Sequence, residues 1–265
     1  MNFSNYQTLL FERRERVLTI TLNRPDKLNA VDGLMHEELA RVFVDAANDA
    51  ESDIIVITGA GRAFSSGGDI DWMQGMIDRP VLFEKTAREG KQIVFSLLDC
   101  EKPVIAKLNG HATGLGATIA LFCDVIFAAE TAKIGDPHVS VGFVAGDGGA
   151  VIWPQLIGYA RAKEYLMTGD LMSAVEAARI GLINHAVPAG ELDKRVDDFA
   201  DRLARGATKA IRWSKVSANI GLKQLAHSIM DASLAYEALS NISADHQEAV
   251  SAFREKRQPV FGRGK

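Results

Sequence analysis

Short apolar runs alternate with longer amphipathic stretches through the first half of the chain. From Leu34 to Ala46, apolar residues recur every three or four positions, which is the spacing of a helix. A polar, glycine-rich loop follows residue 58 and precedes a helical stretch that reaches about Ser96, and an apolar helix is predicted between the last two runs. The runs that predict strands are residues 17–22 (VLTITL), 54–58 (IIVIT), 104–108 and 124–129. Strands that alternate with helices favour parallel pairing in an α/β architecture.

The pattern becomes mostly helical from about Gly149 onward. Ser173 and Glu176 have the spacing of a capping box, in which the serine accepts the N3 amide and the glutamate reaches back to the N-cap amide. Gly181 predicts the end of that helix. Residues 182–187 predict one last strand, and long helices then continue to about residue 256. The whole pattern predicts one α/β core with a helical C-terminal extension.

Composition and charge narrow the function classes. The 265 residues are 47% hydrophobic and 24% charged, which is typical of a globular protein with a large core. A formal net charge of −4 argues against nucleic acid as a partner, because phosphate binding needs clustered Lys and Arg. No apolar stretch reaches about 18 residues, so we expect no membrane-spanning helix and no membrane partner.

Cysteine content and the first residues predict a cytoplasmic protein. Cys100 and Cys123 lie in apolar surroundings and lack the spacing of a metal site or a redox pair. Two thiols do not make a disulfide framework, which suits a reducing compartment. The segment MNFSNYQTLLFERRERV reaches its charges before any long apolar run, so it does not predict a signal peptide.

Two glycine-bearing turns, each following a predicted strand, are the first candidates for chemistry. Residues 62–70 (RAFSSGGDI) contain Gly67 and Gly68, where a backbone without Cβ permits close approach of a ligand. Residues 109–118 (NGHATGLGAT) place the amide of Leu115 at the start of a helix. Neither turn has a Walker lysine or a full GxGxxG, so nucleotide binding is not predicted. Each turn alone is typical of an ordinary connection, but together they form a candidate oxyanion hole.

At these residues the chain resembles the crotonase (enoyl-CoA hydratase/isomerase) family. The motifs that carry the resemblance are LNRPDKLNA, GRAFSSGGDI, KPVIAKLNGHATGLGATIAL, TAKIGDP and, near the end, AFREKRQPVF. The resemblance implies an α/β spiral of ββα units over residues 1–200 and a helical C-terminal oligomerisation region over residues 201–265. It also implies assembly into a homotrimer or a dimer of trimers.

The same resemblance implies an acyl-CoA substrate, with coenzyme A as part of the substrate and no further cofactor or metal. The two oxyanion donors of the family fall on the N–H groups of Gly68 and Leu115. Phe253 and Lys256 would reach the coenzyme A of a neighbouring subunit. The residues that would lie along coenzyme A are Lys27, Leu28, Ala30, Ser66, Gly67, Asp69 and Ile70.

The chain departs from the hydratases at their two glutamates, whose positions hold Thr118 and His138. A threonine hydroxyl is not a general base near neutral pH, so ordinary two-glutamate hydration is doubtful. Because a free histidine side chain titrates near neutrality, we interpret His138 as a base for water, with Asp147 as its carboxylate partner. Asp136 is interpreted as a turn-former before Pro137. The nine-residue spacing from His138 to Asp147 resembles the β-diketone hydrolase branch of the family.

Several alternatives remain open from the sequence. The leading interpretation is an acyl-CoA-processing enzyme of the enoyl-CoA hydratase/isomerase class. The alternatives are a hydrolase that cleaves a carbon–carbon bond of a β-dicarbonyl compound, and a non-catalytic binding protein with the crotonase fold. Asp147 is also compatible with a helix cap, and Trp72 and Met73 with either an acyl pocket or core packing. Glu237 and the other acids of the helical tail are predicted to lie on solvated faces.

Overall fold

The computed structural model describes residues 3–262, in which the strands form two sheets. The larger sheet has the order β1 (Leu9–Arg14), β2 (Val17–Leu22), β3 (Ile54–Gly59), β5 (Val104–Leu108), β7 (Val125–Ala129) and β10 (His185–Val187). The smaller sheet has the order β4 (Ala63–Ser65), β6 (His111–Thr113), β8 (Lys133–Gly135) and β9 (Met172–Ser173). The β1–β2 and β8–β9 pairs are antiparallel, and the other pairs are parallel.

A repeated unit relates the two sheets. Three times in succession, a strand of the larger sheet (β3, β5, β7) is followed by a strand of the smaller sheet (β4, β6, β8) and then by helix. These helical segments are α2 (Ile70–Asp78), α4 (Leu115–Leu121), and the 3-10 helix η2 (His138–Val141) with α5 (Gly149–Thr168). Since corresponding strands pair in parallel, the units stack into the α/β spiral of ββα units that the sequence predicted.

Both faces of the larger sheet are covered, which explains its nearly continuous apolar strands. Successive side chains of a strand point to opposite faces. Ile55 and Ile57 therefore pack in one core with α1 (Gly33–Ala47), α3 (Leu82–Asp99), α4 and α5. Ile54 and Val56 pack on the other face against α7 (Leu192–Ala204), which follows the 3-10 helix η3 (Ala189–Glu191).

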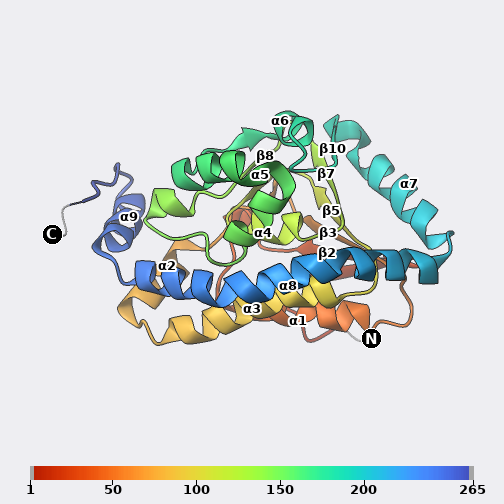
Figure 1. Ribbon diagram of the computed structural model, residues 1–265, viewed down its shortest axis with the longest axis horizontal. Helices are drawn as coiled ribbons and strands as arrows, with labels where there is room; N and C mark the ends of the chain where they lie inside the picture. The colour runs from red at the N-terminus through yellow and green to blue at the C-terminus, as the bar shows by residue number, and fades with distance from the viewer. Residues whose placement is uncertain (1–2, 263–265) are drawn as a thin grey trace.

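The C-terminal helices lie across the core, and the last of them contacts the helical segments that follow β4 and β8 of the smaller sheet. α8 (Thr208–Asn241) packs on α3 and α5, and α9 (Ala244–Arg254) contacts α2 and η2 (Figure 1). The predicted boundary near residue 200 falls within α7. No helix among residues 3–262 is long and apolar enough to cross a membrane, and Cys100 and Cys123 are both free and buried.

The structure differs from the predicted elements where local sequence carries a weak signal. β4 and β6 lie in segments predicted as loop, since three residues are too few to show a two-residue alternation. The helical stretch predicted to reach residue 96 is two helices, α2 and α3, with Pro80 between them.

Two further differences lie around α6 (Ala174–Arg179). Ser173 Oγ accepts the Glu176 amide at 3.1 Å as predicted, but the Glu176 carboxylate pairs with Arg179 instead of returning to the N-cap amide. Leu182 and Ile183 donate their amides to Ala177 O and close α6. Only residues 185–187 of the predicted 182–187 strand therefore join the sheet.

Asn29 joins the η1 segment (Pro25–Lys27) to the segment that leads into β4. It follows η1, is fully buried and adopts a φ of 53°. Its side chain accepts the Arg24 amide at 2.9 Å and donates to the carbonyls of Ala60 and Ala63, both at 2.9 Å. These bonds tie the η1 segment to the segment that leads into β4.

We expect Asn29→Ala to lower the free energy of unfolding by about 2–4 kcal/mol, because it leaves buried backbone groups without partners. Equilibrium denaturant unfolding measures the change. Asn48→Ala, at an exposed asparagine after α1, is the matched control. Equal stability of the two variants would contradict a structural role for the Asn29 side chain.

Candidate active site

Three loops converge because β4, β6 and β8 are parallel neighbours, so that their carboxyl ends meet at one edge of the smaller sheet. A Cβ placed on Gly67 would lie 3.0 Å from the Thr113 carbonyl oxygen, so these two turns are in contact. A Cβ on Gly114 would lie 3.7 Å from His138 Cε1, which brings the third loop to the same point. The three sequence-predicted segments therefore form one site.

The N–H groups of Gly68 and Leu115 are the free donors at this junction. In the β4–α2 turn, the amides of Ser66, Gly67 and Asp69 donate to Leu28 O, Ser65 Oγ and Val31 O. The Gly114 amide donates to Gly135 O, and Leu115 is the first residue of α4. Among the described residues, neither Gly68 nor Leu115 has an acceptor for its N–H, and both residues line one pocket.

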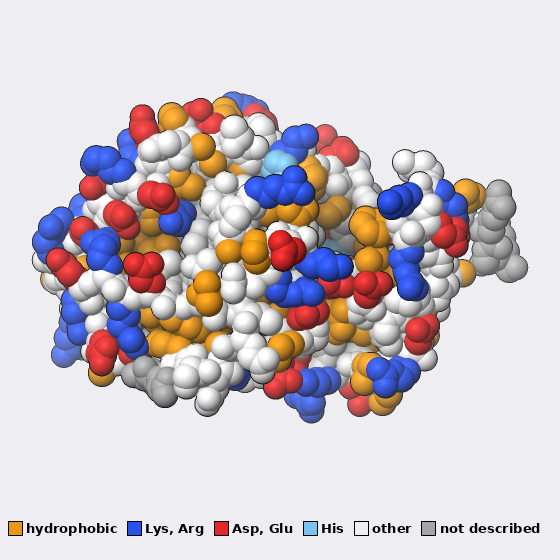
Figure 2. Space-filling view, turned by 180° about the vertical axis from the view of Figure 1, so that it is seen from behind, with side chains coloured by type: hydrophobic (Ala, Val, Ile, Leu, Met, Phe, Trp, Pro, Cys, Tyr) orange, Lys and Arg blue, Asp and Glu red, His pale blue; other side chains and the backbone are white. Residues whose placement is uncertain are grey.

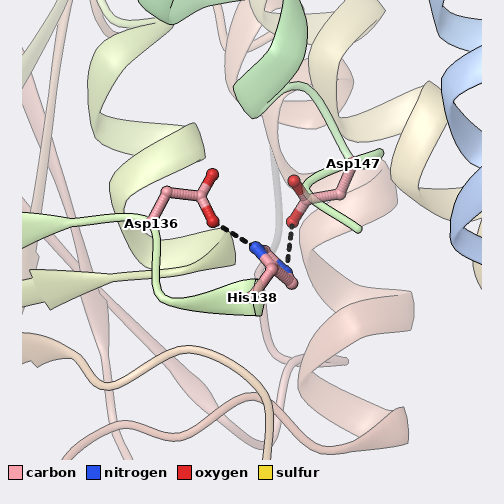
Figure 3. A group of neighbouring side chains, drawn as sticks. All are labelled: Asp136, His138 and Asp147. Atoms are coloured by element: carbon pink, nitrogen blue, oxygen red, sulfur yellow. Dashed lines mark hydrogen bonds and ion pairs between the residues drawn. The ribbon is translucent and has the colours of Figure 1, made fainter. Parts of the chain in front are cut away.

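His138 lies between two buried carboxylates (Figure 3). Its Nδ1 forms a short hydrogen bond with Asp136 Oδ1, and its Nε2 faces Asp147 Oδ2 at 3.7 Å. The other oxygen of Asp147 accepts the Thr118 hydroxyl at 3.2 Å. Sequence reasoning gave Asp136 to the turn alone. The structure corrects this, because the 3-10 turn after Pro137 folds the His138 ring back onto the Asp136 carboxylate.

Burial and neighbouring charges have opposing effects on the pKa values of His138 and Asp147. Burial lowers the pKa of His138, but the charges of Asp136 and then Asp147 outweigh it and raise the pKa to about 10. Burial raises the pKa of Asp147, and the attraction of His138 only partly offsets the rise. At neutral pH the imidazole is therefore an imidazolium held between the carboxylates.

Asp136, His138 and Asp147 also have the residue types of a metal site, with ligand atoms within 4.8 Å of one another. The carboxylates, however, lie at opposite nitrogens of the ring. Each ring nitrogen already faces a carboxylate oxygen, so an ion bound to either nitrogen would have to replace one of these contacts. The geometry thus favours proton sharing over metal binding.

Glu237 of α8 is a site residue that sequence reasoning placed on a solvated face. Its side chain is instead buried, with 4% of the residue exposed, and lines the same pocket as His138 and Asp147. Gly146 permits this approach, since a Cβ there would lie 2.6 Å from Glu237 Oε2. Burial, followed by the charge of Asp147, raises the pKa of Glu237 well above its usual value, which favours the protonated carboxyl. No local pattern signals this, because the contact joins α8 to a loop about 90 residues earlier in the chain.

The pocket that holds these groups is otherwise mainly apolar. Trp72 and Met73 line it and also pack against the cluster of Met76, Phe83 and Phe143, so both interpretations of the sequence stay open. Met76, Phe83, Phe143 and Leu234 complete the apolar part. The pocket thus places two backbone donors and the His138 group beside mainly apolar side chains.

A larger groove of about 600 Å³ adjoins this pocket, and Gly68, Met73 and His138 line both. Phe253 of α9 borders the groove of its own chain, whereas the sequence interpretation directed it to a neighbouring subunit. Lys256 is not among the lining residues. The other residues predicted to lie along coenzyme A all line the groove: Lys27, Leu28, Ala30, Ser66, Gly67, Asp69 and Ile70.

Figure 2 shows one face of the molecule, where basic and acidic side chains are interspersed. Lys and Arg side chains flank a hollow on this face near the C-terminal end of the described chain. The face carries no continuous basic surface of the kind that a nucleic-acid duplex requires.

Comparisons with known proteins agree with this architecture. Residues 12–264 match the family described as "Enoyl-CoA hydratase/isomerase". The chain is 36% identical to a crotonyl-CoA hydratase of Syntrophomonas wolfei, over 97% of this chain and 98% of that protein. It is 32% identical to 2,3-dehydroadipyl-CoA hydratase of Escherichia coli, over 96% of this chain and 98% of that protein.

Solved structures extend the comparison. An enoyl-CoA hydratase/isomerase from Mycobacterium paratuberculosis superposes with a TM-score of 0.88 at 36% identity, covering 93% of this chain and 99% of that one. A β-diketone hydrolase from the cyanobacterium Anabaena superposes with a TM-score of 0.84 at 30% identity, covering 91% and 96%. The fold, the family match and these relatives together show that the chain is an enzyme of the crotonase (enoyl-CoA hydratase/isomerase) family.

Proposed function

We propose that this enzyme adds water at the β-carbon of an acyl-CoA thioester while two backbone N–H groups hold the thioester oxygen. The observation that carries the proposal is the placement of His138, between Asp136 and Asp147, in the pocket that the free amides of Gly68 and Leu115 also line. Attack at the β-carbon moves negative charge onto the thioester oxygen. Donors that are fixed before the reaction stabilise this charge without reorganisation.

His138 and Asp147 divide the proton transfers in this proposal. An imidazolium with a pKa of about 10 has no free lone pair at neutral pH, so it acts as the acid and not as the base that the sequence suggested. The Asp147 carboxylate accepts the proton of the attacking water, and the Thr118 hydroxyl orients it. His138 Nε2–H then protonates the α-carbon of the enolate. Proton return across the 3.7 Å between Nε2 and Oδ2 restores the resting state.

Coenzyme A is proposed to occupy the groove beside the pocket. The groove is about 600 Å³ and opens at the backbone amides, so a thioester carbonyl at Gly68 leaves the remainder of coenzyme A along Lys27–Ala30 and Ser66–Ile70. The similarity to the crotonyl-CoA hydratase of Syntrophomonas wolfei and the 2,3-dehydroadipyl-CoA hydratase of Escherichia coli supports an acyl-CoA substrate.

Assembly into a trimer or a dimer of trimers is proposed for the helical region 201–265. The support is a set of exposed apolar side chains on and just after α8, namely Trp213, Ile220, Leu239 and Ile242.

The second candidate function is hydrolysis of a carbon–carbon bond in a β-dicarbonyl substrate. Water attacks the β-carbonyl, the bond between the α- and β-carbons breaks, and the leaving enolate remains at Gly68 and Leu115. Asp147 again takes the proton of the water and His138 protonates the α-carbon, yielding a carboxylic acid and a shortened thioester. Thr118 and His138 in place of the two hydratase glutamates favour this reaction, as does the similarity to the Anabaena hydrolase.

A first experiment supplies a short 2-enoyl-CoA and the β-ketoacyl-CoA of equal length in ¹⁸O-labelled water, with products followed by mass spectrometry. Label in a β-hydroxyl indicates hydration, and label in a released carboxylate indicates carbon–carbon cleavage. We expect His138→Asn and Asp147→Asn each to lower kcat/KM by about 10²–10⁴-fold, since each removes one proton transfer.

The control for these variants is His111→Asn, which keeps an acceptor near the Lys133 amide outside the pocket. Unchanged turnover in both site variants would remove His138 and Asp147 from the mechanism. Failure of the wild type to convert any thioester would favour the non-catalytic alternative.

The pH profile provides a second prediction. We expect kcat/KM to rise as Asp147 ionises and to fall as His138 loses its proton near pH 10. Asp136→Asn removes the charge that raises the His138 pKa, so the alkaline limb should move down by about one to three pH units. Asp170→Asn, at an exposed aspartate, should leave the limb in place. An unmoved limb in Asp136→Asn would show that Asp136 does not act through His138.

A third prediction tests the oxyanion donor. Leu115 is the first residue of α4, a position where proline fits a helix and removes only the N–H. We expect Leu115→Pro to lose about 10²–10³-fold in kcat relative to Leu115→Ala, which loses the side chain but keeps the donor. Circular dichroism of both variants verifies folding. Equal kcat values would eliminate the Leu115 amide as an oxyanion donor.

A further inference from the structure

His36 is a second histidine of the acyl pocket, and neither proton transfer nor coenzyme A binding uses it. It lies on α1, is only 3% exposed and lines the pocket together with His138 and Leu115. Its Nδ1 pairs with Glu89 Oε2 of α3 at 2.8 Å. The imidazole is therefore held by one nitrogen while part of its ring faces the cavity.

The His36–Glu89 pair is the buried end of a series of ion pairs that begins at the protein surface. Lys85 Nζ lies 3.4 Å from Glu89 Oε1 and 2.5 Å from Glu37 Oε2, which is exposed. Glu89 thus has a cation on its outer oxygen and the imidazole on its inner one. The carboxylate fixes the orientation of the His36 ring and keeps a proton on Nδ1.

The second ring nitrogen of His36 has no hydrogen-bond partner among the described residues. Because Nδ1 points to α3, the edge that carries Nε2 is the one left for the pocket. The nearest aromatic neighbour is Trp72, whose ring centroid lies 5.1 Å from that of the imidazole. Trp72 packs beside the ring and leaves Nε2 unpaired.

Most of the other side chains that line this pocket are apolar, so the His36 imidazole is one of its few polar groups. Trp72, Met76, Phe83, Ala87 and Leu234 line the same pocket and offer hydrocarbon or aromatic surface. A plain alkyl chain against such a wall would bury Nε2 without a partner, which costs free energy. A ligand with an oxygen at this position would satisfy it.

We propose that His36 Nε2 binds a second oxygen of the substrate, on a carbon of the acyl group remote from the thioester. The substrate class is therefore an oxygenated acyl chain and not a plain alkyl chain. A neutral ring accepts a hydrogen bond from a hydroxyl group, and a protonated ring donates one to a ketone or a hydroxyl. This inference rests on the proposed function, since it takes the pocket to hold the acyl group.

Calorimetric binding to saturated acyl-CoA thioesters tests the proposal. The series extends from pentanoyl-CoA to octanoyl-CoA, each compared with its terminal-hydroxyl derivative and its penultimate-carbon ketone. We expect the wild type to bind one oxygenated member at least about tenfold more tightly than the plain thioester of the same length. Preference for the hydroxyl member alone indicates a neutral His36, and a preference that extends to the ketone indicates a protonated one.

His36→Asn removes Nε2, while its side-chain amide still donates to Glu89 from the place of Nδ1. We expect this variant to reduce the ratio of the two affinities to near unity. Glu37→Gln is the matched control, since it alters the outer end of the same series of ion pairs and should keep the wild-type ratio. Denaturant unfolding of each variant verifies that it is folded.

Two results would overturn the proposal: no preference for an oxygenated thioester at any length in the wild type, or an unchanged preference in His36→Asn. The saturated thioesters have neither a double bond nor a β-carbonyl, so this binding does not depend on the chemistry assigned to His138. A retained preference without turnover would contradict only the proposed function. Turnover without a preference would contradict only the role of His36.

Discussion

The parallel pairing of β4, β6 and β8 is the constraint on which the site depends. These strands have only three residues each, yet their pairing brings the turns at Gly67, Gly114 and Asp136 to one edge of the smaller sheet. They are held in place by the strands of the larger sheet, where β3, β5 and β7 pair in the same order and bury both faces. The hydrophobic core around the larger sheet therefore supports the polar site at the edge of the smaller sheet, because the strands of the two sheets follow one another in the same order.

Electrostatics in the pocket follow from this enclosure. Asp136, His138, Asp147 and Glu237 are all buried, so each ionised form must be supported by a neighbouring charge or hydrogen bond. His138 gains this support from Asp136 and Asp147, and Asp147 gains it from His138 and Thr118. For Glu237, burial and the charge of Asp147 instead raise the pKa and favour the protonated carboxyl. A carboxylate and an imidazolium at 3.7 Å provide a base and an acid in one pair, which suits addition of water to a carbon chain.

Long-range contacts complete the pocket and the groove. α8 supplies Glu237, and α9 supplies Phe253 at the border of the groove. α1 contributes His36 to the pocket, and Glu89 of α3, which lies 53 residues later in the sequence, holds its Nδ1. Charged or hydrogen-bonding groups thus enter an otherwise apolar cavity from helices that also build the core. Substitutions at these positions therefore need a stability measurement beside any measurement of activity.

The sequence by itself determined the α/β architecture, the strands β2, β3, β5 and β7 of the larger sheet and the two glycine-bearing turns, because two-residue and 3.6-residue periodicities and glycine positions are local properties. It did not predict β1, and the strand that it predicted over residues 182–187 begins only at His185, as β10. It also marked His138 and Asp147 as candidates by their types and spacing. Only the tertiary structure decided that Asp136 contacts the His138 ring, that Glu237 is buried, and that Phe253 borders the groove of its own chain. Those facts arise where α8, α9 and η2 pack together. Side-chain burial and ionisation depend on neighbours that are distant in the sequence, so no local pattern contains them.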